Sequence, residues 1–120
     1  MATRTTIREQ DIPAAIAVED RSDLPLDRAN LITRLQALAP AIKSYGVTAL
    51  YLYGSYARGD ADAYSDIDVF VEYALPFTLI DLVKVQHIIE DAVNVHVDVT
   101  TRSALGSVKE AAERDAVRVI

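Results

Sequence analysis

The apolar residues of this chain follow two different periods. Val95 to Thr100 alternates strictly between valine and polar residues, and residues 66–73 alternate in a similar way, which is the period of a strand with one buried face. Residues 47–53 form a mostly apolar run that ends at a glycine. We therefore predict strands over 47–53, 66–73 and 95–100, with a last short strand over 116–120.

The segment from Leu26 to about Tyr45 has the period of an amphipathic helix instead. Its apolar residues recur at helical spacing. Asp27 is the predicted N-cap, because its carboxylate can accept hydrogen bonds from the free N–H groups of the first turn. Pro40 is predicted to kink or split this helix, since proline has no N–H and clashes with the preceding turn.

A longer helix is predicted from Pro76 to about Val93, and Asn94 is predicted to end it. Its apolar side chains are expected to form one buried stripe, which consists of Leu79, Leu82, Val83, Ile89 and Val93. A shorter helix is predicted over 104–114, close to the end of the chain.

This succession of helices and strands predicts an α/β fold in which a short mixed β-sheet packs against helices. The 120 residues are 51% hydrophobic, which suits one domain with its own core. We assign residues 26–120 to that domain. Residues 1–25 contain Pro13 and Pro25 among mixed charges and are interpreted as an extension of unknown role, with one weak helix around 14–19.

The chain is acidic, and its charge is uneven. The formal net charge is −6, with seven basic and seven acidic residues in 1–60 but five basic and eleven acidic residues in 61–120. Direct nucleic-acid binding is not expected, because it needs clustered lysine and arginine. The absence of cysteine excludes disulfides and thiolate metal sites. Neither a secretory signal nor a membrane span is recognisable, so we expect a cytoplasmic protein without a membrane partner.

The residues with most chemical information lie between the first two predicted strands. Gly54 ends the first strand, and residues 55–58 are predicted to form one helical turn. A glycine there lets backbone N–H groups approach a polyphosphate, and Ser55 adds a hydroxyl. Arg58, one turn on, could contact a phosphate or could instead hold the following acidic loop by a salt bridge.

Two carboxylates follow on the next strand. Asp66 and Asp68 are two residues apart, so both side chains leave the same face of the pleat. If the strand that carries Asp98 is a neighbour, three carboxylates converge beside the glycine turn. Such a cluster is costly without a cation, and oxygen ligands indicate Mg²⁺, or Mn²⁺, rather than zinc. Two ions could then be held for an in-line displacement at a nucleotide phosphate, with Asp98 helping to deprotonate the acceptor hydroxyl.

Several neighbouring residues are candidates for contacts with the nucleotide. Tyr56 and Tyr64 flank the motif and are candidates for stacking on a base, whereas Tyr51 and Tyr53 are interpreted as packing residues. Ser65 directly precedes the acidic pair and belongs to the predicted nucleotide-binding set. His96, two residues before Asp98, could approach the site, but it is interpreted as a solvated side chain, and His87 is interpreted in the same way.

These motifs resemble those of a known family, the minimal nucleotidyltransferases of the DNA polymerase β-like superfamily. The resemblance rests on Gly54-Ser55-Tyr56-Ala57-Arg58-Gly59, on Ser65-Asp66-Ile67-Asp68 and on Val97-Asp98-Val99, and it covers about residues 26–120. It points to the antitoxins of the MntA type, which are paired with HEPN-domain ribonuclease toxins. The phenylalanine usual before the glycine is Tyr53 here.

The resemblance has specific implications for the site. It implies the polymerase β-like nucleotidyltransferase fold, with Asp66, Asp68 and Asp98 as catalytic metal ligands and Gly54 and Ser55 at the triphosphate. It also implies ATP as the donor, with AMP transferred to a tyrosine hydroxyl of the cognate toxin, which silences the ribonuclease. A hetero-oligomer with that toxin is the expected assembly.

Two alternatives remain open from the sequence. The chain could neutralise a toxin by stoichiometric binding without catalysis. It could also be a small nucleotidyltransferase that modifies an antibiotic or an RNA end. The intact set of acidic residues favours catalysis, and the absence of a separate acceptor-binding domain favours a protein acceptor that brings its own specificity.

Overall fold

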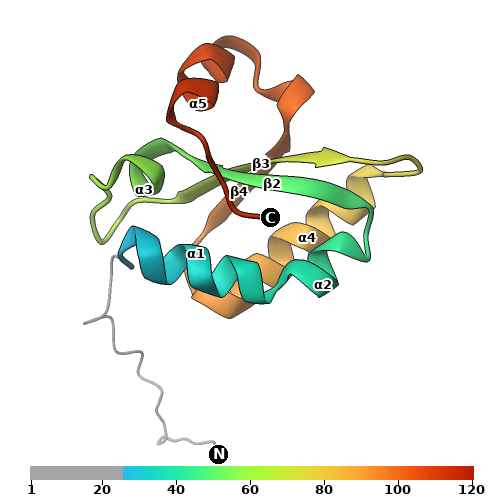
Figure 1. Cartoon of the computed structure of the whole chain (residues 1–120), viewed down its shortest axis with the longest axis horizontal. Helices are drawn as coiled ribbons and strands as arrows, with labels where there is room; N and C mark the ends of the chain where they lie inside the picture. The colour runs from blue at the N-terminus through green and yellow to red at the C-terminus, as the bar shows by residue number, and fades with distance from the viewer. Residues whose placement is uncertain (1–25) are drawn as a thin grey trace, which may run out of the picture.

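A four-stranded mixed sheet in the order β4-β3-β2-β5 lies at the centre of the molecule (Figure 1). β2 (Val47–Tyr53) pairs antiparallel with β3 (Ile67–Tyr73) and β5 (Val117–Arg118), whereas β4 (Val97–Thr101) runs parallel to β3. This computed structural model describes residues 26–120, so the predicted extension over 1–25 and its helix lie outside the described residues. The predicted α/β fold with a short mixed sheet is confirmed.

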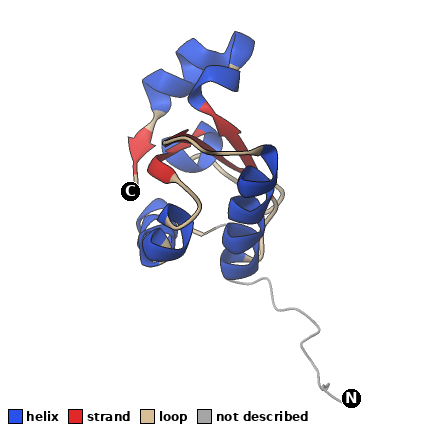
Figure 2. Cartoon of the chain, turned by 90° about the vertical axis from the view of Figure 1, so that its right-hand side faces the viewer, coloured by secondary structure: helices blue, strands red, loops and turns tan. Residues whose placement is uncertain are grey.

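Helices cover both sides of the sheet, as Figure 2 shows. α1 (Arg28–Ala37), α2 (Ala39–Lys43) and α4 (Leu79–Val93) lie against one face, and α5 (Lys109–Asp115) lies on the other (Figure 1). The main core fills the space between the first group and the sheet, and its fully buried large side chains include Leu31, Leu35, Ile42, Leu50, Leu52, Ile67, Val69, Val71, Val85, Ile89 and Val97.

The first predicted helix is split, as its proline indicates. The Asp27 side chain accepts a hydrogen bond from the Asn30 N–H (2.8 Å), which confirms the predicted N-cap of α1. α1 ends at Ala37, and Pro40 lies in the first turn of α2. The N–H groups of a first turn have no carbonyl partner within the helix, so the N–H that proline lacks is not needed there.

The long helix α4 begins later than predicted. It starts at Leu79 rather than at Pro76, because Thr78 forms a capping box with Asp81. Asn94, with φ +56°, ends it as predicted.

The predicted apolar stripe of α4 is wrong in part. Val85, Ile89 and Val93 form the buried row, whereas Leu79 and Val83 are 75% and 41% exposed. Val85 was not in the predicted stripe. By helical spacing Val83 lies on the flank of the buried row, and Leu79 lies in the first turn, so neither side chain reaches the core.

The C-terminal segment also differs from its prediction. In place of one helix over 104–114, two short 3₁₀ turns (Arg102–Ala104 and Gly106–Val108) precede α5. Gly106 has φ +62°, a conformation that cannot continue a right-handed helix. Leu105 and Ala112 of this segment pack on Phe70 and form a second, smaller core on the face of the sheet opposite α1 and α4.

Candidate active site

Strand register places three polar side chains side by side on one face of the sheet. Tyr53 of β2 pairs with Asp68 of β3, and Asp68 pairs in turn with Asp98 of β4. Directly paired residues of adjacent strands project from the same face, with β-carbons about 5 Å apart. The flanking Ile67, Val69 and Val97 are buried in the main core, so this row lies on the α5 side of the sheet. The condition set by the sequence, that the strand of Asp98 is a neighbour of the strand of Asp68, is therefore met.

Gly54 touches the centre of this row. It follows β2 directly, begins the short helix α3 (Gly54–Arg58) and has φ +75°. A β-carbon at this position would lie 2.5 Å from Asp68 Oδ2, inside van der Waals contact. The close approach of backbone and carboxylate therefore requires glycine, and Ser55 follows it in the first turn of α3, partly exposed.

Asp66 approaches the same cluster from the loop before β3. The strand begins at Ile67, one residue later than predicted, and the Asp66 side chain is exposed. One ligand atom from each of Asp66, His96 and Asp98 lies within 4.8 Å of the others. The structure thus brings Asp66 and Asp98 together with His96, and Asp68 joins this group through its strand pairing with Asp98.

His96 belongs to this cluster, although the sequence interpretation favoured a solvated side chain. Its Nδ1 lies 2.9 Å from Glu90 Oε2, and its Nε2 lies 3.1 Å from Asp98 Oδ1. Its side chain is 54% exposed, as expected for a solvated histidine, but it also approaches the site, which is the alternative that the sequence left open. Its position two residues before Asp98 was the available signal, but Glu90 is in α4 and only the tertiary structure brings it near.

The acidic cluster shifts the pKa of several of its members and neighbours. Burial, followed by repulsion from Asp98 and Asp66, raises the pKa of Asp68 to about 6, although Arg58 and His96 partly offset this. Burial and the same acidic neighbours raise the pKa of the Tyr53 phenol. The hydrogen bond to Asp98 is the main cause that raises the pKa of His96, and the hydrogen bond from the Val97 N–H lowers the pKa of Glu90. The site thus carries more negative charge than the nearby Arg58 and His96 neutralise.

The donor set fits a divalent cation. Asp66, Asp68 and Asp98 offer carboxylate oxygens, which are the ligands that Mg²⁺ prefers. Repulsion from Asp98 and Asp66 contributes to the raised pKa of Asp68, and a bound cation would relieve this repulsion. Imidazole nitrogen nearby is compatible with Mn²⁺.

Arg58 connects the glycine turn to the C-terminal helix. Its side chain donates to Asp60 Oδ2 and to Asp115 Oδ2, both at 3.1 Å, and Asp115 ends α5. The salt bridge to the following loop, one of the two roles considered for Arg58, is therefore present. Contact with a phosphate stays a prediction.

The remaining predicted nucleotide contacts lie in the loop before β3. Tyr64 is 94% exposed. The Ser65 hydroxyl accepts from the Asp62 N–H (2.9 Å) and so shapes this loop. Their roles at a nucleotide stay predictions.

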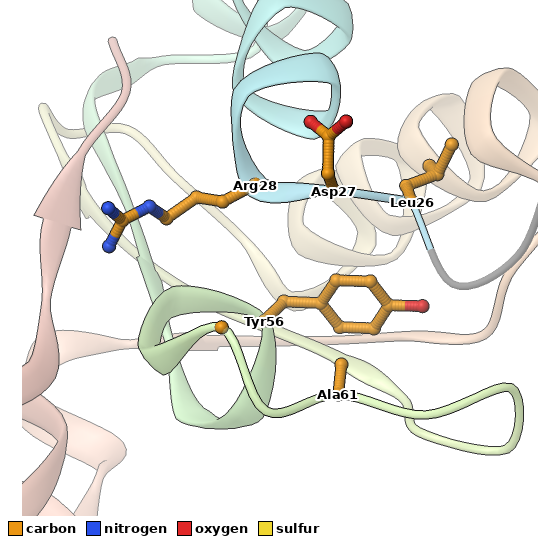
Figure 3. Close-up of a pocket in the computed structure, with 6 residues that line it drawn as sticks. Leu26, Asp27, Arg28, Tyr56 and Ala61 are labelled. Atoms are coloured by element: carbon orange, nitrogen blue, oxygen red, sulfur yellow. The ribbon is translucent and has the colours of Figure 1, made fainter.

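Tyr56 is not available for base stacking on the acidic face. Its ring is 3% exposed and belongs to the main core. Figure 3 shows it between the start of α1 and the loop that carries Ala61, where it lines a cavity of about 300 Å³ together with Leu26 and Arg28. The prediction that Tyr56 stacks on a base is wrong, because α3 turns this side chain toward α1. Tyr51 and Tyr53 do pack on Phe70, as predicted for packing residues, with ring centroids 4.9 and 5.6 Å away.

Comparison with known proteins assigns the family. The sequence profile of the nucleotidyltransferase domain family matches residues 31–119, which include the glycine turn and all three acidic residues. The chain belongs to the nucleotidyltransferase domain family. A relative named protein adenylyltransferase MntA, from Thermococcus cleftensis, is 30% identical over 63 residues, which cover 52% of this chain and 64% of the relative.

Solved structures share the fold of this nucleotidyltransferase domain. One, described as a candidate minimal nucleotidyltransferase, is 27% identical with a TM-score of 0.69, over 78% of this chain and 97% of the other. A chain in the complex of a tri-AMPylated Shewanella oneidensis HEPN toxin with an MNT antitoxin is 17% identical, with a TM-score of 0.58, over 78% of this chain and 71% of that chain. The predicted minimal nucleotidyltransferase fold is confirmed.

The described part of the nucleotidyltransferase domain, residues 26–120, contains no helix with the length and apolar character needed to cross a bilayer.

Proposed function

We propose that this nucleotidyltransferase is an antitoxin that transfers AMP from ATP to a tyrosine hydroxyl of a cognate HEPN ribonuclease toxin and thereby inactivates it. The observation that carries the proposal is the pairing of Asp68 with Asp98 in strand register while Gly54 lies against Asp68. Relatives and structural neighbours named as protein adenylyltransferases and MNT antitoxins support this choice of reaction.

Asp66, Asp68 and Asp98 are the residues that would hold Mg²⁺, as two ions, with Mn²⁺ as a possible replacement. When bound, the cations neutralise the phosphates and polarise the bond that breaks. Gly54 and Ser55, with the N–H groups at the start of α3, would orient the β- and γ-phosphates of ATP. Tyr64 and Ser65 would contact the nucleotide from the loop before β3, and Arg58 would reach a phosphate from the end of α3.

The reaction is a displacement at the α-phosphorus. The tyrosine oxygen forms a new bond to that phosphorus while the bond between the α-phosphorus and the bridging oxygen breaks, and pyrophosphate leaves. Asp98, 59% exposed at its side chain, is open to an incoming acceptor and would take the hydroxyl proton. The pairing with Asp68 keeps this carboxylate beside the phosphate-binding turn.

The acceptor protein would supply the specificity that a small domain lacks. Residues 26–120 would act as the whole nucleotidyltransferase unit and form a hetero-oligomer with the toxin in the cytoplasm, where ATP is abundant. The net charge of −6 does not favour a direct complex with nucleic acid, which agrees with a protein substrate.

Intact-mass spectrometry tests the proposal. The protein encoded by the neighbouring gene is incubated with this chain, ATP and Mg²⁺, and an Asp66→Ala/Asp68→Ala double variant serves as the control. One or more added AMP masses, absent with the variant, support the proposal. A toxin that is silenced in a stable complex without added mass would mean stoichiometric inhibition. Label from ATP on a small molecule or an RNA would identify a different acceptor.

A further inference from the structure

We propose that His96 and Glu90 are positioning residues that fix the direction of Asp98 at the catalytic centre. This inference rests on the proposed function, because it assigns a role relative to the metal-binding carboxylates. It depends on a chain of contacts that runs from α4 through the imidazole to β4.

Among residues 26–120, Asp98 lies on a strand that has a neighbour on one side only. In this part of the chain β4 is the edge strand of the order β4-β3-β2-β5, so Asp98 is flanked by Asp68 of β3 and by no further described strand. Its side chain is 59% exposed. An exposed aspartate at a sheet edge samples several rotamers unless another group restrains it.

Glu90 is the fixed end of the contact chain. It lies in the last turns of α4 and is 25% exposed at its side chain. Its Oε2 accepts a hydrogen bond from the N–H of Val97 (3.0 Å), the first residue of β4, and a longer one from Gln86 Nε2 (3.4 Å). Because one partner is a strand backbone and the other lies one turn earlier in the same helix, this carboxylate has little freedom to move.

His96 joins Glu90 to the catalytic carboxylate. Its carbonyl accepts a hydrogen bond from the N–H of Ile67 (3.0 Å), which connects its backbone to the start of β3. Its ring lies between the two acidic side chains, with Nδ1 2.9 Å from Glu90 and Nε2 3.1 Å from Asp98 Oδ1. Backbone and ring are therefore both restrained.

The contact leaves one Asp98 oxygen for chemistry. Within residues 26–120, the Asp98 side chain is hydrogen-bonded to the His96 ring. This hydrogen bond uses only the Oδ1 atom of the carboxylate. Oδ2 stays available to the cation or to the acceptor hydroxyl. Hydrogen-bonded support of this kind around ligating carboxylates changes metal affinity or activity by about 10–100-fold when it is removed.

The test measures metal binding as well as transfer. The full chain is titrated with Mn²⁺ in the presence of a non-hydrolysable ATP analogue, using calorimetry and the electron paramagnetic resonance signal of free Mn²⁺. His96→Ala is expected to weaken metal binding by about 10–100-fold. His87→Ala, at the other histidine of the chain, an exposed residue of α4, is the matched control and should bind as the wild type does.

Conservative variants separate positioning from a general structural effect. His96→Gln places an amide N–H near the position of Nε2 and should recover most of the metal affinity, whereas His96→Asn places its amide near Nδ1 and should not. Glu90→Ala is expected to weaken metal binding in the same direction as His96→Ala. Equal affinity of His96→Ala and wild type, or equal loss in His96→Gln and His96→Asn, would overturn the proposal.

A double variant asks whether His96 acts through Asp98. In an Asp98→Asn background, His96→Ala should cause no further loss of metal affinity. A further loss of tenfold or more would mean that His96 acts by another route and would overturn the proposal.

The outcomes also separate this proposal from the proposed function. Wild type that binds metal in a His96-dependent way yet transfers no AMP would refute the transfer reaction and retain the positioning role. Wild type that transfers AMP but has the same metal affinity as His96→Ala would retain the transfer reaction and refute the positioning role. Absence of metal binding by the wild type at millimolar concentrations would refute both.

Discussion

The Asp68 carboxylate lies where a side chain of residue 54 would otherwise project, since a β-carbon on Gly54 would be 2.5 Å from Asp68 Oδ2. The end of one strand and the acidic residue of the next are thus in direct contact. This contact holds the turn that starts α3 against the row of Tyr53, Asp68 and Asp98. It turns two motifs that are separate in the sequence into one site.

Gly54→Ala is expected to abolish adenylyl transfer and to destabilise the fold. The substitution adds left-handed backbone strain of about 1–2 kcal/mol and forces Asp68 to move. Gly59→Ala is the matched control, because Gly59 has φ +86° but open space around it. Gly59→Ala should lose stability through the same backbone strain but keep its adenylyl transfer activity. Thermal unfolding and a transfer assay on both variants measure the difference, and equal activity in the two would refute a role for the Gly54 contact.

Asp66→Asn is expected to reduce the stabilisation by Mg²⁺ and ATP while leaving the ligand-free protein as stable as the wild type. Asp66 is exposed and lies near Asp98 as well as His96, so removing its charge should cost little stability before a cation binds. A ligand that binds only the folded state raises the melting temperature, and the variant should lose most of that increase. Differential scanning fluorimetry with and without ligand checks this. A large loss of stability without ligand would instead indicate a structural role.

The raised pKa of Asp68 predicts a pH dependence of stability. Its pKa is about 6 in the folded protein, compared with about 3.9 for an unperturbed aspartate. Ionised Asp68 therefore destabilises the folded state above pH 6, and this penalty disappears as the pH falls through 6 toward 4. Asp68→Asn removes the penalty.

The measurement for Asp68 is a pair of melting curves across pH. Without metal, Asp68→Asn should melt at a higher temperature than wild type at pH 8, and the difference should shrink by pH 4.5. The variant isolates this group because every other titrating residue is common to both proteins. A difference that grows toward low pH would contradict the assigned direction of the pKa shift.

Substitutions at Arg58 and Asp115 separate the two roles of Arg58. Arg58 is about half exposed, so solvent screens its ion pair with Asp115, and Arg58→Ala and Asp115→Asn should each lower stability only slightly. Arg58→Ala should also weaken ATP binding by about tenfold or more, as expected for loss of a charge-assisted hydrogen bond. Asp115→Asn keeps the cation and should bind ATP nearly as wild type does. Equal ATP affinity in both variants would leave Arg58 with the structural role alone.

Local features of this protein were predictable because they depend on neighbours in the sequence. Residues 47–53 form the predicted strand, Asp27 caps α1 and Asn94 ends α4. The face that Asp68 and Asp98 occupy was also predictable, since alternation places them opposite the apolar residues that enter the core, although their pairing as neighbours was not. The motif of Gly54-Ser55 followed by Asp66 and Asp68 was recognisable because its residues lie at a fixed spacing in the sequence.

Features that depend on a helix cap, a backbone conformation or a packing contact were missed. Thr78 displaced the start of α4 from Pro76, and Gly106 divided the last predicted helix into short turns. Tyr56 entered the core because α3 turns it toward α1, although its position beside Gly54 favoured the site. In each case a packing or capping contact outweighed the local pattern.

The sequence by itself determined the chemistry of the site: a glycine turn, a serine and three carboxylates, of which Asp68 and Asp98 lie on strands and Asp66 directly precedes one. Only the tertiary structure decided how those groups are supported. It brings Glu90 from the end of α4 to His96 and His96 to Asp98, across an edge of the sheet that no periodic pattern identifies. The physical reason is that periodicity fixes which face a side chain occupies, whereas strand order and helix packing decide which side chains meet there.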